Sequence, residues 1–318
     1  MNEQNNKYDI KEYSKMLIGR INKNRRRFKG WIKQNSVTCY RLYNHDIPQI
    51  PLIIDWYDGR INCYILTDAS WSQSTHLFMS SLALKAGESL RVAQDNIFIK
   101  YRKHSKGGEQ YGRIEEKNLS FNINEDGLLF TVNLSDRIDT GLFLDHRITR
   151  KLIRKESKGR RVLNLFAYTG SFSVYAAAGG AKITVTADLS NTYLDVAKKN
   201  MELNGFTGFN HRFLKADVLA YLKDPPDEKF DLIILDPPTV STSKAMDKKL
   251  VIKDDHKWMI ESALKMLSKG GVLYFSSNFR QFKLNENISA AKIEEITGKT
   301  VPPDFAGKRP HRCYRIEK

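Results

Sequence analysis

The second half of the chain, from about Ile148 onward, alternates short apolar segments with segments of helical spacing. The apolar segments read RVLNLFAY, KITVTADL, HRFLKAD, FDLIILD and GGVLYFSSN. Near-continuous apolar strands separated by helices are typical of a parallel sheet that is covered on both faces. The sequence therefore predicts an α/β fold with a Rossmann-like, mostly parallel sheet. The binding crevice of such a sheet lies at the carboxyl ends of its strands.

The ends of the first three strands carry a glycine turn and two carboxylates. The turn at Gly170 has neither a GxGxxG pattern nor a following lysine, which speaks against a dinucleotide-dependent enzyme and excludes a P-loop. Asp188 is placed to accept hydrogen bonds from ribose hydroxyls, and Asp217 could accept from an adenine amino group while the Val218 backbone meets the ring edge. Each carboxylate alone could be a helix cap or a turn former. Together they predict an adenosine pocket without a pyrophosphate, which points to S-adenosylmethionine.

The fourth strand, in DLIILDPPTVSTSK, ends on a carboxylate and two rigid residues. Asp236 follows the apolar run directly, and Pro237 and Pro238 restrict the backbone after it. We expect the prolines to fix the direction of the loop so that Asp236 faces the methyl-accepting base beside the cofactor.

Basic residues are in large excess, with a formal net charge of +16 over 318 residues. A surplus of this size usually means a polyanionic partner, with nucleic acid ahead of an acidic membrane. RINKNRRRFKGWIK has seven basic residues and no acid, and GKRPHRCYR closes the sequence with a second basic cluster. One charge run alone could be a solvated helix face, but together these features predict RNA contact. The candidate phosphate-binding residues are Arg20, Lys23, Arg25, Arg26, Arg27, Lys29, Lys33, Lys244 and Arg280.

Composition divides the chain into three segments. Residues 1–36 read as a basic N-terminal helical segment, residues 37–136 as a small α+β domain that we expect to bind RNA, and residues 137–318 as the α/β domain. In the small domain we expect the order β-β-α-β-β.

Turn and helix signals support this order. The Asp-Gly pairs at 58–59 and 126–127 stand between alternating strands, and Asp-Gly is a preferred two-residue hairpin turn. Between them, SWSQSTHLFMSSLALKAG has helical spacing. We expect Leu77, Phe78, Ser81 and Leu82 on one side of it and Gly87 as its C-cap.

Several classes of protein are disfavoured. The longest apolar runs are far shorter than the roughly 20 residues that span a bilayer. The first residues contain no apolar signal region. Three scattered cysteines, Cys39, Cys63 and Cys313, are too few for a disulfide framework or a zinc cluster. We therefore expect a cytoplasmic protein without a bound metal or a membrane partner.

Four stretches, DTGLFLDHR, NLFAYTGSFSV, TADLSNTYLDVAKKNMELNG and ILDPPTVSTSK, resemble the class I S-adenosylmethionine-dependent RNA methyltransferases. The resemblance is greatest to the bacterial 23S ribosomal RNA guanine-N7 methyltransferases. It implies a seven-stranded sheet, S-adenosyl-L-methionine as cofactor, and 23S ribosomal RNA or a large-subunit precursor as partner. In that family the module often forms half of a longer chain whose other half methylates guanine N2. That half has no counterpart here, so any help in opening the RNA is expected from elsewhere or is unnecessary. The oligomeric state stays open.

The resemblance also assigns cofactor-binding residues. Those that would border the methionine end are Phe143, Asp145 and Arg147. Those that would wrap the methionine and the sulfonium are Phe166, Ala167, Tyr168, Thr169, Gly170 and Ser171. The ribose would meet Asp188, with Leu189 and Ser190 beside it, the adenine would meet Asp217 and Val218, and Asp236 would also border the cofactor. For Arg147, a structural ion pair with Asp145 is the alternative.

The possible methyl acceptors are cytosine C5, an exocyclic amine and guanine N7. For the first two, this chain lacks a residue that the related enzymes carry at a defined position. The related cytosine-C5 enzymes carry a cysteine nucleophile after the fifth strand, where this chain has Ser276 and Ser277, and serine is too weak a nucleophile at neutral pH. Exocyclic-amine enzymes commonly follow the two prolines with a stacking aromatic residue, where this chain has Thr239. Phe279 or Trp258 could still supply the stack, so the amine stays an alternative.

Guanine N7 needs the least from the protein. Its lone pair is available and no proton has to leave, so alignment can supply most of the catalysis. We expect the catalytic residues to be Asp236, Pro237, Pro238 and Asn278, with Asn278, Lys244 or Arg280 donating to guanine O6. The main rival from another class is an RNA-binding module without activity, which would leave the carboxylates at the strand ends as a coincidence.

Overall fold

The computed structural model describes residues 9–103, 119–241 and 250–318. Within it the chain forms two compact units. The first consists of Met1–Gly127 and Val132–Thr140, and the second of Leu128–Thr131 and Gly141–Lys318. The chain thus passes finally from the first unit to the second after Thr140. The four residues Leu128–Thr131, which come earlier in the sequence, also belong to the second unit.

The basic N-terminal segment forms one helix, α1 (Ile10–Gln34). Asp9 caps its N-terminus by accepting from the Lys11 N–H at 2.8 Å. Leu17, Ile21 and Phe28 recur at helical spacing and are buried. The basic residues of the opposite face are exposed: Lys23, Arg25, Arg26, Arg27, Lys29 and Lys33.

The first unit is built on a four-stranded sheet in the order β1-β2-β3-β4. The strands are β1 (Cys39–Asn44), β2 (Leu52–Tyr57), β3 (Arg60–Thr67) and β4 (Ile97–Lys103). The first three pair antiparallel, whereas β4 lies parallel to β3 because α2 (Gln73–Ser89) forms the crossover between them. Three strands thus precede the helix, and among the described residues up to 136 three strands follow it, so the predicted order β-β-α-β-β is one strand short on each side of the helix.

The two predicted hairpin turns are confirmed. Asp58 and Gly59 have φ of 43° and 86°, and Asp126 and Gly127 have φ of 57° and 81°. Both central residues of a type I′ turn need positive φ, which explains the Asp-Gly pairs. The second turn joins β5 (Ser120–Glu125) to β6 (Leu128–Asn133), which form a separate two-stranded sheet.

Two predictions for α2 are wrong. Leu77 is 63% exposed, while the buried face carries Met79, Leu82 and Ala86. Gly87 lies inside the helix, and Leu90 is the C-cap. A Cβ on Gly87 would stand 2.2 Å from Cδ1 of Ile97, so the glycine serves close packing and not helix termination.

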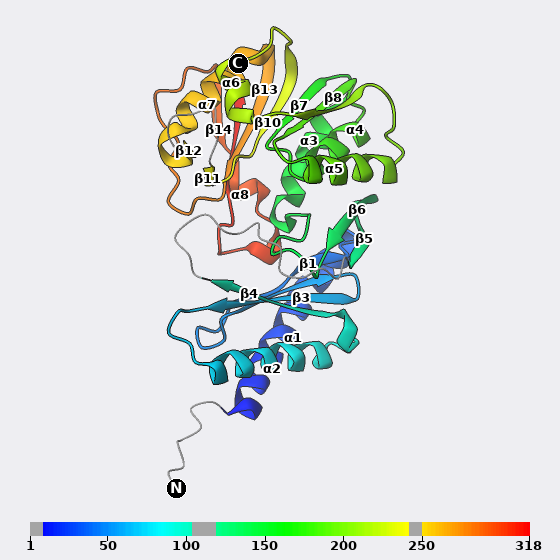
Figure 1. Ribbon diagram of the computed structural model, residues 1–318, viewed down its shortest axis with the longest axis vertical. Coiled ribbons are helices and arrows are strands. Elements are labelled where there is room, and N and C mark those ends of the chain that lie inside the picture. The colour runs from blue at the N-terminus through cyan, green and yellow to red at the C-terminus, as the bar shows by residue number, and fades with distance from the viewer. Residues whose placement is uncertain (1–8, 104–118, 242–249) are drawn as a thin grey trace. The chain divides into compact units, whose positions relative to one another are not determined.

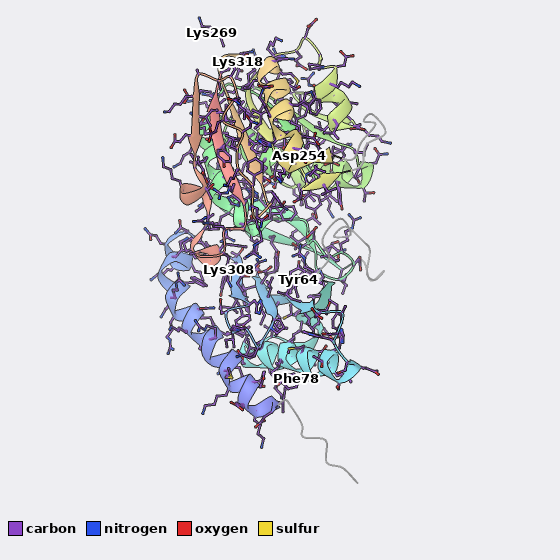
Figure 2. The ribbon with its side chains drawn as sticks, turned by 90° about the vertical axis from the view of Figure 1, so that its left-hand side faces the viewer. Tyr64, Phe78, Asp254, Lys269, Lys308 and Lys318 are labelled. Atoms are coloured by element: carbon purple, nitrogen blue, oxygen red, sulfur yellow. The ribbon has the colours of Figure 1, made fainter. Side chains whose placement is uncertain are left out.

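Different parts of the chain cover the two faces of the four-stranded sheet. On the helix-covered face, Phe78 of α2 packs edge-on against Tyr13 of α1, with ring centroids 5.3 Å apart. On the other face, the Tyr64 hydroxyl of β3 donates to the carbonyl of Ile138 at 2.7 Å. Figure 2 labels Tyr64 and Phe78.

The second unit contains a seven-stranded sheet in the order β14-β15-β13-β10-β7-β8-β9. Its strands are β7 (Arg161–Leu165), β8 (Ile183–Asp188), β9 (His211–Lys215), β10 (Phe230–Leu235), β13 (Leu267–Ser277), β14 (Lys292–Glu295) and β15 (Arg312–Glu317). The pairs from β13 to β9 are parallel, and β15 pairs antiparallel with both of its neighbours. This is the mostly parallel sheet that the sequence predicts. The strand order reverses between β7 and β10, which places the crevice at their carboxyl ends.

Helices cover both faces of this sheet. On one face lie α3 (Arg147–Glu156), α4 (Ser171–Ala178) and α5 (Asn191–Leu203), and on the other α6 (Val218–Lys223) and α7 (Ile252–Met266) (Figure 1). Neighbouring residues of one strand therefore face different helices: Val162 packs with α3 and α4, and Leu163 with α6 and α7. Burial on both sides explains why the strands read as continuous apolar runs.

Short elements complete the described chain. They are η1 (Gln94–Asn96), η2 (Leu144–His146), β11 (Val240–Ser241), β12 (Leu250–Val251), α8 (Thr297–Thr300) and η3 (Pro303–Phe305). Among the described helices, none combines the length and the apolar character that crossing a membrane requires.

Two asparagines of α5 hold the β6 segment that belongs to the second unit. Asn200 Oδ1 accepts from the Thr131 N–H at 2.8 Å, and its Nδ2 donates to the carbonyl of Thr169 at 2.9 Å. Asn204 exchanges two hydrogen bonds of 2.8 Å with the backbone of Leu129. Asn200 is fully buried and so connects β6 directly to the turn that follows β7.

Candidate functional site

The turn after β7 is an unusual piece of backbone. Phe166, Tyr168 and Gly170 have φ of 55°, 51° and 71°, a region that residues other than glycine rarely occupy. A Cβ on Gly170 would stand 2.7 Å from the Cβ of Ala197 on α5, so glycine is required both for conformation and for space. The Ala167 N–H donates to the carbonyl of Ala187 at 3.0 Å, which ties the turn to the end of β8.

Asp188 ends β8 beside this turn. Its Oδ2 accepts from the Tyr168 N–H at 2.8 Å and its Oδ1 from the Ser190 N–H at 2.9 Å. Burial raises the pKa of Asp188 above its ordinary value of 3.8, although these hydrogen bonds oppose the rise. A carboxylate oxygen can accept more than one hydrogen bond, so Asp188 is fixed in place and retains capacity for ribose hydroxyls.

Large apolar side chains surround Asp188 and are partly open to solvent. Phe143 is 39% exposed and Leu189 is 55% exposed. The ring of Tyr168 lies 5.3 Å from that of Phe143 and 4.6 Å from that of Tyr193. An acidic side chain framed by exposed apolar and aromatic groups fits a nucleoside, whose sugar needs acceptors and whose base needs flat apolar contacts.

Asp217 acts as a helix cap. Its Oδ1 accepts from the backbone N–H groups of Leu219 at 3.0 Å and Ala220 at 3.4 Å, at the start of α6. Asp217 is therefore the N-cap of α6, as one of the two interpretations of this carboxylate predicted. An additional contact to adenine stays a prediction.

The ends of β10 and β13 lie side by side because these strands pair in parallel. The Ser276 hydroxyl donates to Asp236 Oδ1, and the Thr239 hydroxyl donates to Asn278 Oδ1. Two short hydrogen bonds thus join the loop after β10 to the end of β13. The other carboxylate oxygen of Asp236 lies 3.8 Å from Nε2 of His146.

The motif that begins at Phe143 meets the C-terminal part of the chain. Asp145 Oδ2 lies 2.9 Å from Nδ1 of His311, and Nε2 of His311 lies 3.1 Å from the Thr300 hydroxyl. Arg147 Nη1 lies 3.2 Å from Asp304 Oδ1, and both side chains are buried. The sequence placed Arg147 at the methionine end of the cofactor or in an ion pair with Asp145, and it gave no sign of Asp304.

Asp145, His146 and His311 place three ligand-type atoms within 4.8 Å of one another. The two imidazole rings are stacked, with centroids 4.2 Å apart and planes inclined by 15°. Imidazole coordinates through a lone pair in its ring plane, and an ion between stacked rings lies outside at least one of these planes. The geometry therefore fits a hydrogen-bonded cluster better than a metal centre.

Comparison with known proteins identifies the family of the chain. The family model for S-adenosylmethionine-dependent methyltransferases matches residues 51–309. The chain belongs to this family. Such enzymes use S-adenosylmethionine, which supplies an electrophilic methyl group on a sulfonium. The residues of this methyltransferase that would hold it are the turn from Phe166 to Ser171, Asp188 and the apolar groups around it.

Curated relatives resemble the methyltransferase over nearly all of its sequence. Ribosomal RNA large subunit methyltransferase K of Neisseria meningitidis is 44% identical over 306 residues, which cover 94% of this chain and 86% of that protein. Ribosomal RNA large subunit methyltransferase K/L of Magnetococcus marinus is 42% identical over 312 residues, which cover 96% of this chain and 43% of that protein. The chain thus spans less than half the length of the K/L protein that it matches.

A solved structure supports the fold. The crystal structure of SMU.776 complexed with SAH matches with a TM-score of 0.75 at 24% identity, over 96% of this chain and 82% of that one. The class I methyltransferase fold is therefore established for this chain, as is its use of S-adenosylmethionine.

Three residues that contact predicted site residues were not themselves predicted. Ser276 was considered only as the place of an absent cysteine, and it binds Asp236. His146 stands between the predicted residues Asp145 and Arg147, so its position in that motif was an available signal. His311 belongs to GKRPHRCYR, which was read only as basic charge, and no local pattern indicates its contact with Asp145.

The other predicted residues belong to other elements or follow the end of β13. The basic residues from Arg20 to Lys33 are on α1, in the first unit. Arg280 is exposed just after β13. Phe279 and Trp258 are partly buried against the core of the second unit, and a stacking role for either stays a prediction. Lys244 lies outside the described residues.

Proposed function

We propose that this methyltransferase forms 7-methylguanosine in the large-subunit (23S) ribosomal RNA. The relatives in Neisseria meningitidis and Magnetococcus marinus are named for large-subunit ribosomal RNA, and they match 94% and 96% of the chain. The net charge of +16 and the exposed basic face of α1 suit an RNA substrate.

The observation that carries the choice of atom is the pair of hydrogen bonds between the β10 loop and β13. At the position where a cytosine-C5 enzyme needs a free thiolate, Ser276 offers a hydroxyl that is engaged with Asp236. At the position where amine enzymes commonly carry a stacking ring, Thr239 holds Asn278. Both features suit an acceptor that needs neither covalent activation nor loss of a proton.

Guanine N7 meets this requirement. N7 attacks with its ring lone pair, the new N7–carbon bond forms as the carbon–sulfur bond breaks, and the electron pair of the broken bond stays on sulfur. Positive charge moves from the sulfonium to the guanine ring and no proton is released. Asp236 lies beside that charge and orients the base, while Asn278 or Arg280 donates to O6. Alignment of the three atoms is the main catalytic contribution.

The target guanine has to be accessible. In A-form RNA the N7 edge faces a deep and narrow major groove that protein side chains do not read, so the base is unpaired or flipped before transfer. The basic face of α1 and the small unit are the parts of the chain suited to hold an opened strand. Their contribution is electrostatic and therefore sensitive to salt.

One experiment tests the proposal. The protein is incubated with large-subunit ribosomal RNA and S-adenosylmethionine labelled in the methyl group, the RNA is digested, and the labelled nucleoside is identified by mass spectrometry. 7-Methylguanosine is the expected product. N2-methylguanosine would move the reaction to the exocyclic amine, and 5-methylcytidine would overturn the argument from the missing cysteine. Binding of S-adenosylmethionine by calorimetry, with no transfer to any RNA, would favour a role without this activity.

A further inference from the structure

His146 occupies the space between the two ends of the candidate site. It closes η2, directly after Asp145, and its side chain is buried. Its Nε2 lies 3.9 Å from Asp145 Oδ2 and 3.8 Å from Asp236 Oδ2. One imidazole nitrogen therefore faces both the carboxylate expected near the methionine end and the carboxylate expected beside the target base.

The surroundings define the state of this ring. Two carboxylate oxygens face Nε2, so the proton of the neutral ring resides on Nε2, where it points to acceptors. Burial and the neighbouring His311 lower the pKa of His146 below its ordinary value of 6.5, which keeps the ring neutral near pH 7. Nδ1 is buried and has no hydrogen-bond partner among the described residues. An unsatisfied buried nitrogen in a packed interior calls for an explanation.

Among the residues that the structure describes, aromatic rings and not hydrogen bonds hold the ring of His146. It stacks on His311 with centroids 4.2 Å apart, and its edge meets the ring of Phe172 at 5.7 Å. His311 itself is fixed by hydrogen-bond contacts to Asp145 at 2.9 Å and to Thr300 at 3.1 Å. Contacts with the two rings thus leave the rotation of the His146 imidazole without a hydrogen bond at Nδ1 among the described residues.

The two carboxylate oxygens of Asp236 differ in their contacts. Its Oδ1 already accepts from Ser276. Its Oδ2 lies 3.8 Å from Nε2 of His146, which is longer than a hydrogen bond. A small rotation of the imidazole ring closes this gap, and catalytic hydrogen bonds are often long before substrate is bound.

We propose that His146 is a positioning residue for Asp236: its Nε2–H closes on Asp236 Oδ2 when the target base is bound and fixes the plane of that carboxylate. Ser276 and His146 then hold the two oxygens of Asp236 from opposite sides. Asp145, held by His311, faces the same nitrogen and limits how far the ring can turn. The inference rests on the proposed role of Asp236 at the target base, and it does not depend on which atom of that base is methylated.

Two substitutions separate positioning from simple filling of the core. In His146→Gln the side-chain amide can place an N–H near the position of Nε2, whereas His146→Phe keeps a flat ring and removes the donor. Methyl transfer is measured as total label in large-subunit ribosomal RNA, cofactor affinity by calorimetry and folding by thermal melting. His211→Phe on β9 is the matched control, because His211 contacts the Thr184 hydroxyl at 2.9 Å and β9 is separated from β10, which precedes Asp236, by β7 and β8.

We expect His146→Phe to lower kcat about tenfold while the Kd for S-adenosylmethionine and the melting temperature stay close to those of the parent. His146→Gln should recover most of the lost kcat. In an Asp236→Asn background, His146→Phe should cause little further loss, because residues that act as one unit are not additive. Equal kcat in His146→Phe and the parent would refute the inference, as would equal losses in the Phe and Gln variants.

This design also distinguishes the inference from the proposed function. If the parent enzyme labels a nucleoside other than 7-methylguanosine, the proposed function fails while the comparison of His146 variants still holds. If 7-methylguanosine is formed equally by the parent and by His146→Phe, the proposed function stands and the inference fails.

Discussion

The Tyr168 N–H donates to Asp188 Oδ2 at 2.8 Å, so the turn after β7 and the end of β8 are joined at the residue expected to bind ribose. Asp188 is thereby oriented before any ligand arrives. Preorganisation of this kind lowers the entropic cost of binding. It also makes the affinity for the cofactor depend on the ionisation of one carboxylate.

Asp188→Asn should weaken S-adenosylmethionine binding about 10- to 100-fold, the range expected for losing hydrogen bonds to a charged acceptor. The ionised form accepts from both ribose hydroxyls, and burial raises the pKa of Asp188 above 3.8. Affinity should therefore be complete at neutral pH and fall as the pH drops through that raised pKa. Calorimetry across mildly acidic pH checks this, and the affinity of the Asn variant should change less with pH. A parallel decline in both proteins would assign the effect to another group.

Gly170→Ala should destabilise the protein by about 1–3 kcal/mol more than Gly205→Ala. Both glycines have positive φ, but only a Cβ at Gly170 meets a neighbour, the Ala197 Cβ at 2.7 Å, whereas a Cβ at Gly205 meets nothing within 4 Å. The difference between the variants thus isolates the steric clash from the backbone strain. Urea unfolding of the two proteins measures it, and equal stabilities would show that α5 can move away from the turn.

Asp236→Ala should lower methyl transfer on the order of 100-fold while cofactor binding is largely kept. The reason is that Asp236 is expected to orient the base and contributes less to holding the cofactor. Asp227→Ala, a change of an exposed carboxylate before β10, is the control. Transfer is followed with labelled cofactor and binding by calorimetry. If Asp236→Ala turned over at the parent rate, Asp236 would have only a structural role, as the partner of the Ser276 hydroxyl.

Replacing Lys23, Arg26 and Arg27 by alanine should weaken RNA binding and make it less dependent on salt. Each phosphate contact that is lost should reduce the slope of log K against log salt by roughly 0.7 for single-stranded RNA. Lys253, Lys265 and Lys269, which are exposed in the second unit, give a control with the same change in net charge (Figure 2 labels Lys269). Filter binding at several salt concentrations measures both. Equal slopes in the two triple variants would mean that total charge, and not the face of α1, determines binding.

The sequence predicted the parts of the fold that depend on local patterns. The apolar runs marked β7, β8, β10 and β13, because burial on both faces leaves a continuous signal. The edge strand β9 has no buried residue, and only Phe213 and Leu214 marked it. The Asp-Gly turns were readable because positive φ selects few residues. For α2 the pattern misled: Leu77 shares the spacing of core residues, but only tertiary packing decides which of two apolar stripes is covered.

The site was predictable at the strand ends and not beyond them. Asp188 is the last residue of β8 and Asp236 follows β10 directly, so the topology alone brings them to one edge of the sheet. The partners Asp145 and His311 are distant in sequence and meet only because β15 is inserted beside β13. No periodicity reports such a contact. The pairing of Arg147 with Asp304 was missed for the same reason.

The way that α5 holds Leu129 and Thr131 limits how this gene can be rearranged. The chain passes between the two units three times, at residues 127–128, 131–132 and 140–141. A recombination event that exchanged everything before residue 141 would remove the strand segment to which Asn200 and Asn204 bind. Asn200 Oδ1, which is buried, would then lose the hydrogen bond that it accepts from the Thr131 N–H, while its Nδ2 would still donate to the carbonyl of Thr169. We therefore expect the two units to be exchanged together in evolution, because neither consists of one continuous segment of the chain.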